Sequence, residues 1–236
     1  MTFELSADDV AERERARTFA NSRVQPQAGD VDRTASIPPG LAAEVTALIT
    51  GAAGALRRAI VVEELATASG AVALAALHGD GKRVGLPGLR GGSLPTDSPS
   101  AQLSLAAVAL GLGQSAINQA LAELRQAAVG VGSEKPHWIV ADAATDLEAA
   151  RLLTRSAARV VDSNQGGQAS IAIARLMASS AARTAVDAAV RIAGPRGYRE
   201  GSLLERLTRD VRAISLLLGT EEDHRSLAAE ELLPER

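Results

Sequence analysis

The chain contains no cysteine, very few aromatic residues and no long uncharged apolar run. Without cysteine it can hold no disulfide, no thiolate nucleophile and no cysteine-ligated metal. Aromatic residues make up only 2% of its 236 residues, so alanine, leucine, valine and isoleucine must build the core. Alanine has the highest intrinsic helix propensity. The composition therefore predicts an all-α protein.

The charges show no excess that would suit a nucleic acid. The 25 basic and 28 acidic residues are spread along the chain and give a net charge of −3, so no basic footprint is present. The amphipathic, acidic start MTFELSADDV is unlike a signal peptide, and we expect a cytoplasmic protein. The longest apolar stretch, residues 103–121, is interrupted by polar side chains, which argues against a membrane span. These are Ser104, Gln114, Ser115, Asn118 and Gln119.

Apolar spacing and helix boundary residues predict a series of helices. Ser6 and Asp9 form a capping-box pattern, from which a first helix should run to about Ser22 and end before Pro26. Gly111 and Gly113 lack a preceding strand, so close helix packing explains them better than dinucleotide binding. Further helices are expected at residues 40–50, 56–77, 103–124, 139–161, 168–192, 203–217 and 221–232.

A segment rich in glycine, proline and serine, residues 79–100, divides the chain. It has no helical period and is typical of a linker. Its length allows at most a short hairpin, so we expect it to bridge two helical parts without a sheet. Residues 1–78 would form an N-terminal helical domain, and residues 101–236 an up-down four-helix bundle.

Several short motifs, in their order and spacing, resemble the acyl-CoA dehydrogenase family. The chain is similar to a shortened member that lacks the middle β-domain. The resemblance covers nearly the whole chain outside the linker. It rests on Phe3–Asp8, Arg17–Ala20, Val24–Pro26, Glu63–Ala66, Ala106–Ala116, Ile192–Tyr198, Glu205–Arg206, Arg209–Asp210 and Leu218–Thr220.

The resemblance implies FAD, an acyl-CoA substrate, and a glutamate that removes the α proton of the thioester. In most members that glutamate stands directly before a Gly-Thr pair, and here the position is Leu218. Leucine cannot accept a proton. Some members place the base at a position that falls near Ala101 and Gln102, and neither of these residues is a base. Glu221 and Glu222 are weak substitutes, because acids at a helix start usually interact with the helix dipole.

The flavin contacts that the family implies are also altered. An Arg and a Phe that reach FAD across the dimer fall on Ala127 and Gly130. In the segment that holds the adenine half of FAD, Pro195 replaces a glycine and has no N–H for a phosphate. We therefore expect the isolated chain not to bind FAD. Gly194 and Gly197 still match the family's cofactor-binding positions, and Arg191 stands where the family has a glutamine. Gly219 and Thr220 form the Gly-Thr pair.

Other polar patterns suggest no chemistry. Glu221 and His224 form a single Glu-x-x-His spacing, whereas a metal site in a helical bundle needs two such pairs with further carboxylates, so no metal is expected. A solvated helix end explains this pair better. His78 and His137 are isolated. The arginines at 13, 15 and 17 alternate with Glu12 and Glu14, which indicates a solvated face.

Two functions remain open from the sequence. The first is a catalytically silent subunit of a homo- or hetero-oligomeric dehydrogenase, a dimer or tetramer joined through the C-terminal bundle, possibly with a full-length acyl-CoA dehydrogenase. The second is an active FAD-dependent oxidoreductase for the CH–CH group of an acyl thioester, with a relocated base or a site completed by another chain. Aliphatic surface on the bundle would favour association. The residues expected there are Leu203, Leu204, Leu207, Leu216 and Leu217.

Overall fold

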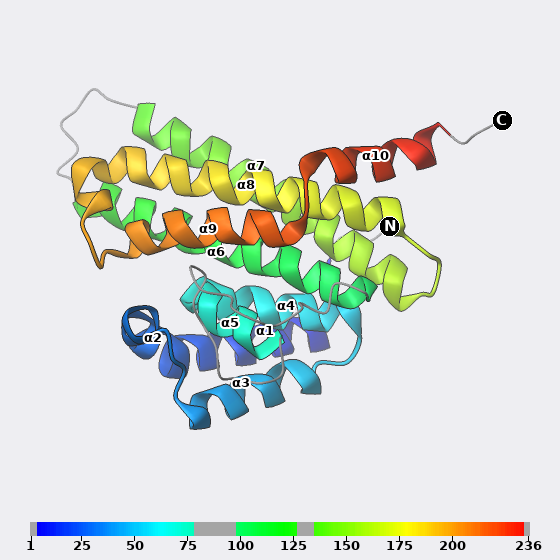
Figure 1. Cartoon of the computed structure of the whole chain (residues 1–236), viewed down its shortest axis with the longest axis horizontal. Helices are drawn as coiled ribbons and strands as arrows, with labels where there is room; N and C mark the ends of the chain where they lie inside the picture. The colour runs from blue at the N-terminus through cyan, green and yellow to red at the C-terminus, as the bar shows by residue number, and fades with distance from the viewer. Residues whose placement is uncertain (1–3, 78–97, 127–134, 234–236) are drawn as a thin grey trace.

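The structure is a computed structural model that describes residues 4–77, 98–126 and 135–233, and the elements of this part are all helical. The prediction of an all-α protein is confirmed (Figure 1). The N-terminal helices are α1 (Ala7–Phe19), α2 (Ala28–Thr34), α3 (Pro39–Gly51), α4 (Gly54–Ala68) and α5 (Gly70–Leu77). The later helices are α6 (Pro99–Gln126), α7 (Lys135–Asp162), α8 (Gln168–Ala193), α9 (Leu203–Leu218) and α10 (Glu221–Leu232).

The first helix starts as its sequence predicts but continues further. Ser6 Oγ accepts from the Asp9 N–H, and the Asp9 carboxylate accepts from the Ser6 N–H, so the capping box is confirmed. The α-helix itself ends at Phe19, before Pro26 as predicted, but the chain stays helical beyond it. A π-helical turn (Ala20–Val24) and a 3-10 turn (Gln25–Gln27) lead directly into α2. Proline is accommodated because it stands in the first turn of the 3-10 segment, where its missing N–H costs no hydrogen bond.

The helix predicted over residues 56–77 is two helices. Ser69 adopts an extended conformation with φ −161° between α4 and α5. Its side chain then accepts from the Val72 N–H at 3.4 Å, so a serine ends one helix and starts the next.

The long helix α6 lies at the centre and packs on both α4 and α8. A Cβ on Gly111 would lie 2.5 Å from the Glu63 carbonyl oxygen, and one on Gly113 would lie 2.7 Å from Leu147 Cδ1. The predicted close packing at these glycines is therefore confirmed. The length and composition of α6 would suit a membrane span, but 78% of its apolar window is buried inside the protein.

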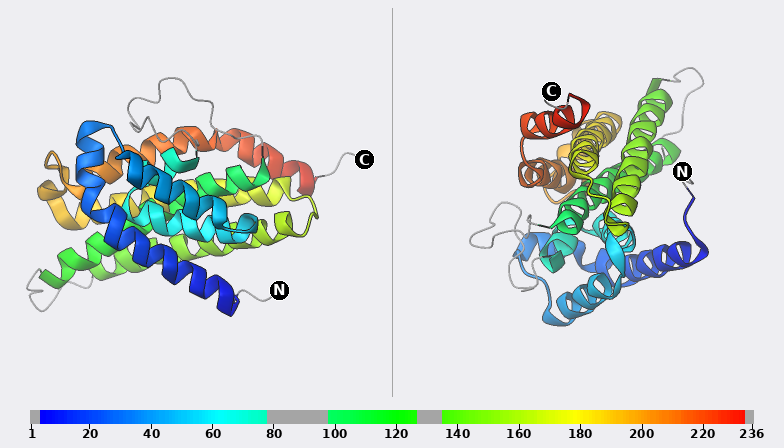
Figure 2. Two further views of the ribbon diagram at one scale, coloured as in Figure 1. Left: turned by 90° about the horizontal axis from the view of Figure 1, so that it is seen from below. Right: turned by 90° about the vertical axis from the view of Figure 1, so that its right-hand side faces the viewer.

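The N-terminal helices lie along one side of the bundle formed by α6 to α10 (Figure 2). Both parts contribute to one hydrophobic core. The Asp162 carboxylate at the end of α7 accepts from the Ala55 and Leu56 N–H groups at 2.6 and 3.0 Å, which caps α4. Arg209 on α9 makes a bidentate ion pair with Asp32 on α2, at 2.8 and 3.2 Å. Polar contacts thus fix the two parts to each other.

Some predictions fall outside the described residues. The segment 78–97, with most of the predicted linker and His78, is among them, and its role as a bridge stays a prediction. Pro99 and Ser100, which the prediction placed in the linker, begin α6.

The expectation of a continuous leucine surface on α9 is wrong in part. Leu204 and Leu207 are each 3% exposed and belong to the core of the chain itself. Leu203 and Leu217 are partly buried and pack against that core. Leu216 is 84% exposed. Leu204 and Leu207 thus lie on the inward face of α9, whereas Leu216 points outward from the same helix.

Candidate functional site

The position of the family's usual base lies at the end of α9. The Leu218 side chain is buried, and its carbonyl oxygen accepts a hydrogen bond from Arg175 Nη2 on α8. The same oxygen accepts from His224 Nε2 on α10 at 2.7 Å. Gly219 follows with φ +95° and ends α9, and the Thr220 hydroxyl caps α10 by accepting from the Asp223 N–H. Gly219 and Thr220 therefore form the turn between two helices.

The second possible base position joins the same cluster. Arg175 Nη1 donates to Gln102 Oε1 on α6 at 2.9 Å. One guanidinium thus links Leu218 with Gln102, and the resemblance places the alternative base near Ala101 and Gln102. We refer to Gln102, Arg175, Leu218 and His224 as the base corner. A cation stands there where the chemistry requires a proton acceptor.

His224 is buried rather than solvated, which corrects the expectation for this helix end. It is 4% exposed, and burial lowers its pKa, which favours the neutral imidazole. Burial also lowers the pKa of Arg175. Within the described residues, His224 Nδ1 and Arg175 Nε have no hydrogen-bond partner. The same region brings together no group of three His, Asp or Glu side chains that could hold a metal.

The two weak substitutes for the base have other surroundings. Glu221 forms ion pairs with Arg183 on α8 and with Arg225, the latter at 2.7 Å. Hydrogen bonds from Arg183 first, and then from Arg225, lower the pKa of Glu221, which weakens it as a base. Glu222 is exposed in the first turn of α10. Both acids stand where a helix N-terminus favours negative charge.

The segment that matches the adenine site forms the end of α8. Gly194, with φ +62°, donates its N–H to the Val190 carbonyl, so this N–H serves the helix end. Pro195 has no N–H to offer. Gly197 is buried, and a Cβ there would lie 3.3 Å from Leu204 Cδ1. Arg191 is exposed. These described residues do not fit a cradle for FAD; Ala127 and Gly130 lie outside the described residues.

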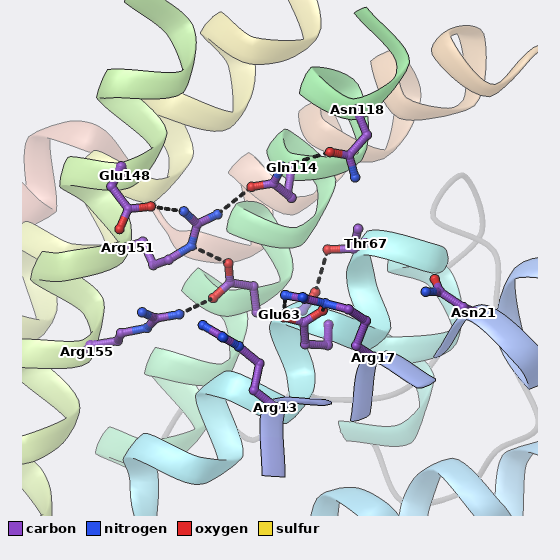
Figure 3. A pocket seen from close by; sticks show the side chains of 11 residues that line it. Arg13, Arg17, Asn21, Glu63, Thr67, Gln114, Asn118, Glu148, Arg151 and Arg155 are labelled. Carbon is purple, nitrogen blue, oxygen red and sulfur yellow. Dashed lines mark hydrogen bonds and ion pairs between the residues drawn. The ribbon is translucent and has the colours of Figure 1, made fainter. Parts of the chain in front are cut away.

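A second polar site lies between α1, α4, α6 and α7 (Figure 3). It is a cavity of about 480 Å³, which we call the charged pocket. Its charged lining side chains are Arg13, Arg17, Glu63, Glu64, Glu148, Arg151 and Arg155. The expectation that all three arginines of α1 lie on a solvated face is therefore wrong for Arg13, whose side chain is 29% exposed, whereas the Arg15 and Arg17 side chains are 61% and 46% exposed.

Glu63 organises the floor of the charged pocket. Arg151 Nε donates to Glu63 Oε1 at 2.6 Å, Arg151 Nη2 donates to Gln114 at 2.8 Å, and Nη1 pairs with Glu148. Arg155 stands 3.9 Å from Glu63 Oε2. The side chains of Glu63, Arg151 and Arg155 are only 10%, 12% and 13% exposed. This site could not be predicted from local spacing, because Glu63 and Arg151 lie 88 residues apart in the chain.

Comparison with known proteins gives a consistent result. Residues 100–233 match the family described as "Acyl-CoA dehydrogenase, C-terminal domain". The chain is 32% identical over 136 residues to the probable acyl-CoA dehydrogenase YngJ of Bacillus subtilis (strain 168), covering 56% of this chain and 36% of that protein. It is 37% identical over 137 residues to the mitochondrial short-chain specific acyl-CoA dehydrogenase of Bos taurus, covering 56% and 33%. The match thus spans about a third of these relatives.

Solved structures extend the similarity in fold to the whole chain. Butyryl-CoA dehydrogenase from Megasphaera elsdenii superposes with a TM-score of 0.83 at 18% identity, covering 99% of this chain and 100% of that chain. PigA with FAD and proline gives 0.79 at 13% identity, covering 98% and 99%. The match to the family over residues 100–233, together with the helical fold, shows that this chain belongs to the acyl-CoA dehydrogenase family.

Proposed function

We propose that this chain is a catalytically silent member of the acyl-CoA dehydrogenase family that acts as a subunit of an oligomer. The observation that carries the proposal is the base corner. Leu218 and Gln102 carry no carboxylate. The Arg175 guanidinium lies between them and donates a hydrogen bond to each residue. Abstraction of an α proton needs a basic group within hydrogen-bond reach of the substrate. An arginine stays protonated and cannot take this role.

The surroundings of the two substitute acids support the same proposal. Glu221 is held by Arg183 and Arg225, and its lowered pKa makes it a weaker proton acceptor. Glu222 is exposed at the start of α10. A relocated base would need a carboxylate in a protected, positioned setting, and neither residue has one.

The proposal includes the absence of stoichiometric FAD on the isolated chain. A cofactor needs protein groups that bind it and orient its reactive atom. In the segment that resembles the family's adenine site, the Gly194 N–H is used by the helix end and Pro195 has none. The family's middle β-domain also has no counterpart in the sequence.

Association through the C-terminal helices is the third part of the proposal. Leu216 on α9 is 84% exposed, and Tyr198 and Trp138 are 66% and 57% exposed. Exposed aromatic and aliphatic side chains are enriched in protein interfaces. We propose an obligate cytoplasmic homo-oligomer, a dimer or tetramer; a full-length acyl-CoA dehydrogenase is the alternative partner.

A direct test mixes the purified chain with FAD, separates it by gel filtration, and assays it with butyryl-CoA and an electron-accepting dye. The proposal predicts no flavin absorbance with the protein peak and no dye reduction, while an active butyryl-CoA dehydrogenase reduces the dye. Light scattering on the same peak should give a mass above one chain. One flavin per chain with dye reduction would favour the active oxidoreductase, and a stable monomer at micromolar concentration would contradict the subunit role.

A further inference from the structure

The charged pocket has a buried floor and an open rim. On the floor, the Glu63, Arg151 and Arg155 side chains are 10–13% exposed. At the rim, the Arg17 and Glu148 side chains are 46% and 52% exposed. A cavity of about 480 Å³ lies within the size range of small-molecule sites. Solvent can therefore reach charged groups that are otherwise shielded.

The ion pairs inside the pocket do not use its cations equally. Arg151 is fully engaged by Glu63, Glu148 and Gln114. Arg17 makes a bidentate pair with Glu64, at 2.9 and 3.0 Å. Arg155, by contrast, has an oxygen of Glu63 only at 3.9 Å, which is too long for a hydrogen bond.

Two buried donors in the pocket remain unsatisfied. The Nε atoms of Arg13 and Arg155 are buried and have no hydrogen-bond partner among the described residues. Arg13 uses its Nη2 to reach Glu14 at 3.4 Å on the surface side. Figure 3 shows the Arg13 guanidinium directed toward Glu63, next to Arg155. Buried donors normally find a partner, and both side chains line the cavity, so Arg13 and Arg155 keep hydrogen-bonding capacity that the described residues do not use.

The electrostatics of Arg155 indicate the charge of the missing group. Burial lowers the pKa of Arg155, and the positive charges of Arg151 and Arg13 lower it further, while Glu63 opposes the shift. The protein thus holds positive charges close together in a sheltered place. An added anion would relieve this repulsion, whereas an added cation would increase it.

We propose that the charged pocket binds a small oxyanion, a carboxylate or phosphate group, between Arg13 and Arg155. A guanidinium presents its donors in a planar fork that suits both groups. The amide and hydroxyl groups of Asn21, Thr67 and Asn118 line another part of the cavity and can contact polar atoms of the same molecule. A polar organic acid or a phosphorylated metabolite is therefore the expected class of ligand. This inference is independent of the proposed silent subunit.

The test measures thermal unfolding in sodium phosphate, sodium citrate and sodium chloride at matched ionic strength. A ligand that binds only the folded state raises its stability in a concentration-dependent way. Phosphate or citrate should raise the melting temperature beyond chloride, and the stronger of the two identifies the phosphate or the carboxylate source. The variant Arg155→Gln should weaken this binding at least about tenfold, the effect of losing one charge-assisted hydrogen bond.

Matched variants separate binding from folding. Arg199 is exposed outside the pocket, so Arg199→Gln changes the net charge equally and should keep the full anion response. If Arg155→Gln does not fold, Arg13→Gln replaces it, because Arg13 is closer to the rim, with a 29% exposed side chain. A response to phosphate and citrate no larger than to chloride, or one unchanged in the folded pocket variant, would overturn the proposal.

Discussion

The base corner and the charged pocket both contain buried arginines, but they use them differently. In the base corner, Arg175 donates to the Leu218 carbonyl and to Gln102, two neutral acceptors on different helices. In the charged pocket, Arg151 pairs with the buried Glu63, and Arg155 stands beside it without a hydrogen bond to that carboxylate. The first site ties helices together where the family performs chemistry, and the second keeps charged groups around an open cavity.

The difference concerns the position at which most family members would carry the base. A buried carboxylate base at position 218 would need solvation or a partner, and leucine removes that need. The remaining Leu218 carbonyl is satisfied by Arg175 and His224. In this chain, Leu218 therefore takes part in a contact between α8, α9 and α10. Family membership gives the fold, whereas the residues in the site decide the function.

The largest effect is expected from Leu207→Glu. Leu207 is 3% exposed in the core, so the variant buries a charge with no partner and should lose on the order of 5 kcal/mol of unfolding free energy. This is enough to unfold a typical domain. Circular dichroism during urea titration measures the change.

Leu216→Glu is the matched control, because Leu216 is 84% exposed on the same helix. It should leave the fold intact and reduce the mass measured by light scattering, if α9 takes part in the interface. A Leu207→Glu protein as stable as the wild type would show that the inward face of α9 is assigned wrongly.

The next largest effect is expected in the floor of the charged pocket. Glu63→Gln leaves Arg151 and Arg155 buried without their shared carboxylate, and breaking a buried ion pair costs about 3–5 kcal/mol. The neighbouring Glu64→Gln interrupts a pair with Arg17, whose side chain is 46% exposed, and should cost about 1 kcal/mol or less. Equal losses in urea unfolding would contradict the distinction between floor and rim.

A smaller effect concerns Asp210, a buried carboxyl group outside both sites. Burial raises its pKa to about 7. The folded state therefore holds the proton more tightly than the unfolded chain, so this group makes stability fall as the pH rises from about 4 to about 7. Asp210→Asn should remove this dependence and be more stable at pH 8 by up to about 4 kcal/mol, at about 1.4 kcal/mol for each pKa unit. An unchanged pH profile would argue against the raised pKa.

The smallest effect is expected at His224 in the base corner. Its pKa is lowered by burial, so the folded state resists protonation. The contribution of His224 to stability is complete above the unfolded pKa of about 6.5 and is lost as the pH falls below it. His224→Gln should reduce the loss of stability between pH 7 and pH 5, measured by thermal unfolding at each pH. The variant Arg175→Gln keeps His224 and should retain most of that loss, because burial is the largest cause of the lowered pKa and the charge of Arg175 is a smaller one.

Much of the fold could be predicted because its boundary residues act locally. The helix predicted at 168–192 is found at Gln168–Ala193, between Gly167 and Gly194, and the capping box of Ser6 and Asp9 is present. The helical turns that carry the chain through Pro26 were not predicted, because the effect of a proline depends on its position within the turn. The break at Ser69 was missed, because an apolar pattern continues through it.

The sites were harder to predict for a physical reason. The position of Leu218 follows from its Gly-Thr neighbours, which are adjacent in the chain. Arg175, 43 residues away, could not be associated with it by any local spacing. Arg13 and Arg17 appear in an alternating charge pattern that is typical of a solvated helix, and only the packing of α1 against α4 directs them into a pocket.

The central claim is that this chain has no base for α-proton removal, and hydrogen exchange tests it most directly. The chain is incubated with FAD and butyryl-CoA in D₂O, and mass spectrometry of the recovered thioester counts deuterium at the α carbon. We predict exchange no faster than in buffer alone, while an active butyryl-CoA dehydrogenase under the same conditions incorporates deuterium. Faster exchange that depends on this chain and is lost in Glu221→Gln or Glu222→Gln would contradict the account by revealing a relocated base.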